Sequence, residues 1–280
     1  MSIKSDIVAA GRRLYERGLV ASNDGNISVR EGESVWATPT NVSKGAMTED
    51  MLVRLDLDGN VLEGRLKPSS EIKMHLAIYR ANPDLRAVVH AHPPAATAFA
   101  SAGLPLDSAI LQETVVQLGV VPLAPYALPG TQALAESCAP LCREYNAALL
   151  EYHGATAWGE SLTQALHRME SVEYYAQILM KLRLMGAERP MTREQVNGLL
   201  SLRPAWGFTG GGVPKCRGKR LRLTVSFGNS RPRAGNGPSP RCGSGYAPHR
   251  GYRSSRTLQL LRLRGRRAAA PRSPAASGAE

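Results

Sequence analysis

The chain has 280 residues, of which 43% are hydrophobic, and a formal net charge of +12. It contains no run of 18 apolar residues and no apolar N-terminal core, so neither a membrane span nor a signal peptide is expected. Its four cysteines form no C-x-x-C pair, which argues against a disulfide framework and favours a reducing, cytoplasmic location.

The first 204 residues contain apolar segments with helical spacing and short segments typical of strands. Helices are expected at 6–18, where Gly18 should end the helix, and at 69–82, 95–103, 131–145 and 161–186. Strands are expected at 25–30, 34–40, 86–92 and 120–126, as a hairpin at 51–64, and as two segments within 147–159. Because hairpins and helices interleave without a regular strand–helix–strand alternation, we predict an α+β domain with a mainly antiparallel sheet and helices on its faces.

Two histidines one residue apart, His90 and His92, end the apolar segment AVVHAH. In a strand, side chains at i and i+2 point to the same face, so both imidazoles should lie close together. A third histidine, His153, follows another apolar segment and precedes a glycine, which suits a strand end that faces a cleft. Three histidines would give a catalytic zinc ion its protein ligands and leave one position open.

The helix expected at 69–82 begins with Ser69, Ser70 and Glu71. Free N–H groups at a helix start bind anions, and a carboxylate beside them can act as a general acid or base. The polar turns NDGNIS and TPTN offer further N–H groups that could converge on the same anion. Each of these features alone also fits ordinary capping and turn chemistry.

Positive charge is concentrated at the C-terminal end. Residues 205–280 hold 16 of the 35 Lys and Arg residues and one acidic residue, which leaves residues 1–204 at −3 and gives the tail +15. We therefore predict a folded domain at 1–204 and a basic tail rich in Gly, Arg and Pro at 205–280. The tail is interpreted as a disordered segment, as the product of a frameshift in a GC-rich gene, or as a nucleic-acid or membrane arm. A nucleic-acid partner is least favoured because no aromatic platform accompanies the charge.

The segments GNISVR, ATPT, LKPSSEIK, AVVHAHPP, APYALPGT and LLEYHGATAWG, in this order, resemble the class II aldolase/adducin family. The resemblance covers about residues 5–190 and is greatest to zinc aldolases of the fuculose-phosphate type. It implies a three-layer α/β/α fold with an antiparallel central sheet. It also implies a homotetramer with a zinc site near a subunit interface, and a phosphorylated sugar as the substrate.

The resemblance also assigns roles to single residues. It implies that His90, His92 and His153 bind Zn²⁺, and that Glu71 binds the metal in the free enzyme and then serves as the catalytic acid/base. The implied phosphate-binding positions are Gly25, Asn26, Thr40, Asn41, Ser69 and Ser70. At the position of Asn41 the fuculose-phosphate type has glycine, so one backbone contact is in question there.

Two further positions distinguish subfamilies. Glu71 after the paired serines favours the aldolases over the epimerases, which have aspartate there, and Ser70 argues against decarboxylase-like relatives, which tend to have lysine. No tyrosine stands near Leu111, where the fuculose-phosphate type has a catalytic tyrosine that acts on a neighbouring subunit's site; Gln112 or Glu113 could take a polar role instead.

We expect a lyase of carbohydrate metabolism that cleaves a ketose 1-phosphate, fuculose- or 5-deoxypentulose-like, to dihydroxyacetone phosphate and an aldehyde. A pentulose-phosphate 4-epimerase, a dehydratase and a non-catalytic adducin-like scaffold stay open as alternatives.

Overall fold

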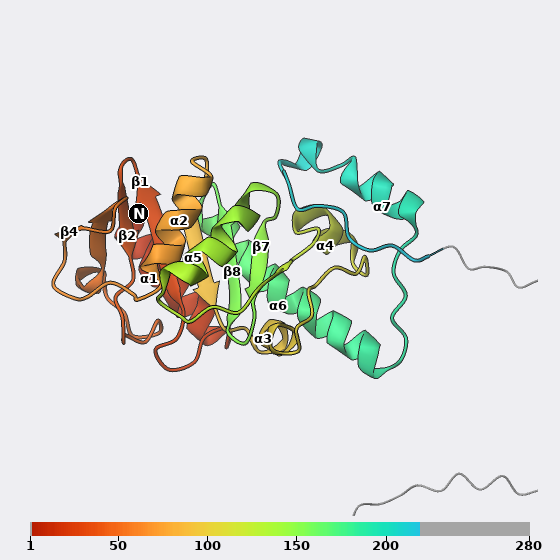
Figure 1. Cartoon of the computed structure of the whole chain (residues 1–280), viewed down its shortest axis with the longest axis horizontal. Coiled ribbons are helices and arrows are strands. Elements are labelled where there is room, and N and C mark those ends of the chain that lie inside the picture. The colour runs from red at the N-terminus through yellow and green to blue at the C-terminus, as the bar shows by residue number, and fades with distance from the viewer. Residues whose placement is uncertain (1, 219–280) are drawn as a thin grey trace, which may run out of the picture. The chain divides into compact units, whose positions relative to one another are not determined.

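A computed structural model describes residues 2–218 of the chain, and its centre is one eight-stranded sheet (Figure 1). The strands are β1 (Asn26–Glu31), β2 (Ser34–Ala37), β3 (Val53–Asp56), β4 (Val61–Glu63), β5 (Ala87–Ala91), β6 (Leu123–Ala124), β7 (Ala147–Leu150) and β8 (Gly154–Gly159). Their order is β4-β3-β2-β1-β5-β8-β7-β6. All neighbouring strands are antiparallel except the short pair β6 and β7, which is parallel.

Helices cover both faces of this sheet. They are α1 (Ile3–Glu16), α2 (Ile72–Ala81), α3 (Pro94–Ser101), α4 (Gln112–Gln117), α5 (Gln132–Cys138), α6 (Leu162–Leu184) and α7 (Arg193–Leu200), with short 3-10 turns η1 (Glu49–Met51), η2 (Ala139–Arg143) and η3 (Pro204–Trp206). One core joins α1, α3 and α6 to one face, and a second core joins α2 and α5 to the other. Figure 1 shows α2 and α5 in front of the strands and α6 behind them. The predicted α/β architecture with a mainly antiparallel sheet is therefore confirmed.

The central strand β5 shows how the sequence pattern produces the layers. Ala87, Val89 and Ala91 are fully buried in the core of α1, α3 and α6, whereas Val88 is buried in the core of α2 and α5. Side chains alternate along a strand, so His90 shares the face of Val88 and points towards α2. This places a fully buried histidine in the middle of the domain.

The structure differs from the expected elements in one expected helix and in two further helices. The helix expected at 131–145 ends at Cys138 and continues as the 3-10 turn η2, because Pro140 has no N–H to extend the α-helical ladder. The helices α4 and α7 were not expected, although Thr192 and Gln195 form a capping box at the start of α7, a signal readable in the sequence. Among the described residues, no helix combines the length and apolar character that a membrane crossing requires.

The folded part of the chain extends past residue 204, the boundary that composition predicts. The guanidinium of Arg203 donates hydrogen bonds to the carbonyl oxygens of Val115 and Gly210 at 2.6 Å each. The backbone N–H of Gly211 donates to the carbonyl of Glu144, and that of Arg217 donates to Met191. Residues 205–217 therefore include a segment bonded to the domain, while the rest of the predicted tail, 219–280, lies outside the described residues.

Candidate active site

His90 is the buried centre of the candidate site. Its strand β5 lies between β1 and β8, with Asn26 and Thr156 as its register partners. The Nδ1 atom of His90 lies 2.9 Å from the carbonyl oxygen of Ala155 and can only donate to it, so Nε2 is left unprotonated in the neutral ring. Burial, and next the nearby His153 and His92, hold the pKa of His90 well below its ordinary value, which keeps the ring neutral.

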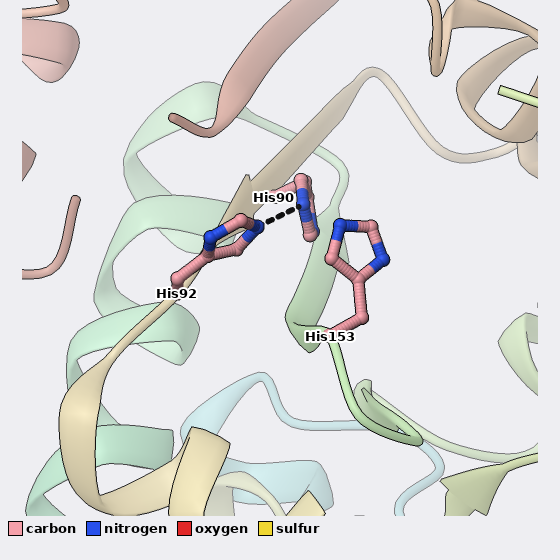
Figure 2. Close-up of side chains that lie close together, drawn as sticks. All are labelled: His90, His92 and His153. Carbon is pink, nitrogen blue, oxygen red and sulfur yellow. Dashed lines mark hydrogen bonds between the residues drawn. The ribbon is translucent and has the colours of Figure 1, made fainter. Parts of the chain in front are cut away.

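His92 lies one residue beyond the end of β5, so the prediction that both histidines lie within the strand is wrong for this residue. Its backbone N–H donates to the carbonyl of Leu19, and its Nε2 still lies 3.1 Å from Nε2 of His90. Gly154 makes room for the ring, because a Cβ there would lie 2.7 Å from Cδ2 of His92. Figure 2 shows the rings of His90, His92 and His153 facing a common point.

His153 and Glu71 complete this group from the turn between β7 and β8 and from the start of α2. Nε2 of His153 lies 3.2 Å from Oε1 of Glu71, and Nε2 of His90 lies 3.2 Å from Oε2. Glu71 is the N-cap of α2, one position earlier than the first turn in which it was expected. Its side chain is buried, and Oε2 accepts a 2.7 Å hydrogen bond from Nδ2 of Asn26. Burial also lowers the pKa of His153.

The donor set of this group fits a divalent metal. The histidine ligand nitrogens all lie within 4.8 Å of one another. Two nitrogens bound to zinc at about 2.0–2.1 Å in tetrahedral geometry are about 3.3 Å apart, close to the 3.1 Å between His90 and His92. Facing lone pairs at this distance repel each other unless a proton or a cation lies between them. In addition, Oε1 of Glu71 is buried and has no hydrogen-bond partner among residues 2–218. Imidazole donors suit zinc and also other divalent transition metals.

A polar pocket of about 210 Å³ lies beside the histidines. It is lined by Asn23, Asp24, Gly25, Asn26, Pro39, Thr40, Asn41, Ser69, Ser70, Glu71, His92, Pro129 and His153. All six residues for which phosphate binding was predicted therefore line one cavity with Glu71 and two of the histidines. In the part of the chain that the structure describes, no lysine or arginine lines this polar pocket.

Single residues of the polar pocket refine the sequence-based expectations. Asn41 adopts a left-handed backbone with φ of 58°, which glycine favours and asparagine tolerates, so the exchange of glycine for asparagine keeps the same conformation available. The hydroxyl of Ser69 accepts a 3.3 Å bond from the N–H of Glu71 and so stabilises the turn that leads into α2. The neighbouring Ser70 is exposed to the pocket.

Sequence inspection missed two neighbours of the site. Asp24 lines the polar pocket, and its Oδ2 lies 3.5 Å from Nδ1 of His92. Lys44 is buried behind the pocket wall, and no local pattern in the sequence distinguishes it from a surface lysine. Conversely, Gln112 and Glu113, the candidates for a polar role near Leu111, do not line the pocket of this single chain.

A larger cavity of about 510 Å³ lies at the opposite end of β5, against α1 and the start of α6. Its lining includes Arg13, Arg86 and His167, but none of the residues predicted for the site. It lacks a cluster of potential metal ligands, and Arg13 is already bonded to Glu170. The smaller polar pocket is therefore the candidate active site.

Comparison with known proteins agrees with this geometry. Residues 5–180 match the family described as "Class II Aldolase and Adducin N-terminal domain". The chain is 35% identical over 183 residues to 3-oxo-tetronate 4-phosphate decarboxylase of Escherichia coli O6:H1, and the aligned residues cover 64% of this chain and 86% of that protein. It is 33% identical over 199 residues to 5-deoxy-D-ribulose 1-phosphate aldolase of Bacillus thuringiensis serovar kurstaki, covering 70% and 92% respectively. A solved L-fuculose 1-phosphate aldolase superposes with a TM-score of 0.68 at 31% identity, over 74% of this chain and 96% of that one.

Proposed function

The chain belongs to the class II aldolase and adducin family, and from this premise we propose that it is a metal-dependent aldehyde-lyase. Its substrate would be a ketose 1-phosphate, fuculose- or 5-deoxypentulose-like, cleaved to dihydroxyacetone phosphate and a short aldehyde. The observation that supports this best is that the six residues predicted to bind phosphate line one polar pocket together with the buried Glu71 and two histidines of the potential metal-ligand set.

The metal would be zinc, held by His90, His92 and His153, with Glu71 as a fourth ligand in the free enzyme. When bound, the metal would act as a Lewis acid for the negative charge that develops on the substrate oxygen during cleavage. The neutral state of His90 and its bond to Ala155 support this role, because a ligating imidazole needs a free lone pair and a fixed orientation.

The phosphate group of the substrate would bind in the polar pocket between Ser70 and the two turns that contain Gly25 and Asn41. Ser70 offers an exposed hydroxyl, and the turns around Gly25 and Asn41 offer backbone and amide N–H groups. Binding of this remote group positions the reacting carbons without taking part in the chemistry. The pocket should therefore discriminate phosphorylated from unphosphorylated sugars.

Glu71 would supply the proton transfer. When the C3–C4 bond breaks, the carboxylate of Glu71 would accept the proton of the C4 hydroxyl as C4 becomes the aldehyde carbon, and the electron pair of the bond would stay with C3. Delivery of that proton from Glu71 to C3 would then complete dihydroxyacetone phosphate and regenerate the carboxylate. The burial of Glu71 and its closeness to His90 and His153 support this assignment.

A decarboxylase is the second candidate, because a relative of 35% identity bears that name. Loss of CO₂ from a 3-oxo acid also leaves an electron pair on a carbon next to a carbonyl, so the same donor set would serve both reactions. Ser70, where decarboxylase-like relatives tend to have lysine, favours the aldolase.

The resemblance further implies a cytoplasmic homotetramer, and light scattering of the purified protein tests the tetramer.

One substrate screen separates the candidates. Purified, zinc-loaded protein is incubated with several ketose 1-phosphates and with 3-oxo-tetronate 4-phosphate, while dihydroxyacetone phosphate and CO₂ are measured. Release of dihydroxyacetone phosphate and an aldehyde from a ketose 1-phosphate, without CO₂, supports the aldolase. Release of CO₂ from 3-oxo-tetronate 4-phosphate, which also leaves dihydroxyacetone phosphate, supports the decarboxylase. An isomerised pentulose phosphate would indicate an epimerase, loss of water a dehydratase, and no product at all a scaffold.

A further inference from the structure

Lys44 is one of the largest fully buried side chains of the domain, with a relative exposure of 1%. Its ammonium donates hydrogen bonds to the carbonyl oxygens of Asn23 at 3.2 Å and of Val42 at 2.7 Å. These carbonyls belong to two separate loops, one before β1 and one after β2. Asn23 and Asn41 from the same loops line the polar pocket and bond to each other at 3.3 Å. Lys44 therefore joins the two loops directly behind the pocket wall.

This environment is unusual for an ammonium group. A buried charge is normally paired with an opposite charge, yet no carboxylate of the described residues lies within ion-pair distance of Lys44. Burial lowers the pKa of Lys44 to about 8, and the negative charge of Asp24 opposes that effect only in part. A bound anion could therefore provide the counter-charge that the ammonium of Lys44 lacks.

The polar pocket contains negative charge without a basic side chain of its own. Its walls, as far as the described residues form them, include the carboxylates of Asp24 and Glu71 but no lysine or arginine. A dianion such as phosphate would find hydroxyl and amide donors there, without a basic side chain in contact. The ammonium of Lys44 lies behind the pocket-lining loops, against the carbonyls of Asn23 and Val42, and is shielded from solvent. Its electric field is therefore screened less by water and salt than that of a surface lysine.

We propose that Lys44 is a positioning residue of the anion site: its ammonium holds the loops of Asn23 and Val42 together and supplies the positive charge behind the pocket that favours a dianionic ligand over a neutral one. The inference rests on the proposed function for the identity of the ligand. It goes beyond that function because it assigns the preference for phosphate to a residue that does not touch the ligand.

The test compares Lys44→Met with Lys73→Met in the full-length, zinc-loaded protein. Both changes remove one positive charge, but Lys73 is exposed on α2. Calorimetry with inorganic phosphate at pH 7 should show about tenfold weaker binding for Lys44→Met, and a change of less than about twofold for Lys73→Met. Zinc content should be equal in all three proteins, because the hydrogen bonds of the Lys44 ammonium go to the carbonyls of Asn23 and Val42, which are not metal-ligand positions. Phosphate affinity equal to that of the wild type in a folded Lys44→Met protein overturns the inference.

A purely structural role is distinguished by a neutral ligand. If Lys44→Met weakens an unphosphorylated ketose by the same factor as phosphate, Lys44 only maintains the loops and the inference is wrong. Should Lys44→Met not fold, Lys44→Gln keeps an N–H donor for the carbonyls without the charge, and the same loss of phosphate affinity is expected. Normal phosphate binding by the variant together with an active wild type refutes only the role of Lys44. A wild type that neither binds phosphate nor cleaves any ketose 1-phosphate refutes the proposed function as well.

Discussion

The Nδ1–H of His90 points to the carbonyl oxygen of Ala155 on the neighbouring strand, 2.9 Å away. The register of β5 against β8, in which His90 pairs with Thr156, creates this contact. Because the bond uses the only N–H of the neutral ring, the other nitrogen presents its lone pair towards His92. Strand pairing thus determines which nitrogen of His90 is available to a metal.

Removal of His92 should abolish metal binding. The purified wild type is expected to contain about one zinc ion per chain, from the usual ligand count of catalytic sites, and His92→Ala should lose both zinc and activity. His92 is better suited to this test than His90, because its partly exposed ring is not part of the core. Elemental analysis measures the metal and circular dichroism checks the fold. Stoichiometric zinc in the variant would exclude His92 from the site.

Gly154→Ala should lower zinc affinity, although Gly154 is not itself a metal ligand. The added Cβ would lie 2.5 Å from the carbonyl oxygen of Ala91 and 2.7 Å from Cδ2 of His92, so the ring must move. Displacing one ligand in this way should reduce zinc affinity by about 10–100-fold, the range found when the support of a ligand is lost. Competition with a fluorescent chelator measures the affinity. Gly198→Ala, at a site with nothing within 4 Å, is the control and should bind zinc normally.

The two serines before α2 should differ in their effects. Ser70→Ala should weaken a phosphorylated ligand by about 1–3 kcal/mol, the value of a charge-assisted hydrogen bond, and leave the unfolding temperature unchanged. Ser69→Ala should weaken the same ligand and also lower stability by about 1 kcal/mol, because the hydroxyl of Ser69 accepts a hydrogen bond in the turn that leads into α2. Calorimetry and thermal unfolding measure the two effects. If phosphorylated and unphosphorylated sugars lose affinity equally, the serines only stabilise this turn.

Glu71→Gln should separate catalysis from structure. The amide cannot exchange a proton as a carboxylate does, so kcat should fall by about 10²–10⁴-fold. The fold should persist, since the remaining carbonyl oxygen can still accept the bond from Nδ2 of Asn26. Activity is compared at equal zinc content, because Glu71 is also a proposed metal ligand. A zinc-replete variant that cleaves substrate at the wild-type rate would end the acid/base assignment.

Buried His75 should make the metal-free protein sensitive to acid. Burial lowers its pKa from 6.5 to about 3, so below pH 6.5 the unfolded chain takes up a proton that the folded chain excludes. This contribution to stability is complete above pH 6.5 and is lost as the pH falls towards 3, by about 2 kcal/mol at pH 5.

Urea unfolding of chelator-treated protein at pH 7 and pH 5 measures this loss. The free energy of unfolding should fall less in His75→Gln than in the wild type, by that same amount of about 2 kcal/mol. His167→Gln, which changes an exposed histidine on α6, should follow the wild type. Identical pH dependence in His75→Gln and the wild type would contradict the prediction.

Much of the fold follows from local patterns in the sequence. Alternating and helical apolar spacing locates most strands and helices, because each element must bury one face. Gly18 ends α1 as expected, since its φ of 67° lies in the left-handed region that glycine favours. The motifs HAH and PSSE indicate the chemistry of the site because their spacing alone places side chains on one strand face or at one helix start.

Only the tertiary structure decided where these side chains meet. Pairing of β5 with β1 and β8 brings His90 beside Asn26 and places His153 within reach of Glu71. Composition cannot reveal the burial of Lys44, because one of the two carbonyls that accept hydrogen bonds from its ammonium belongs to Asn23, 21 residues earlier in the chain. Nor could it show that the chain beyond residue 204 bonds to the domain through Arg203. Periodicity reports which face of an element is buried, whereas register and loop contacts depend on partners far away in the chain, and those partners determine the distances on which chemistry depends.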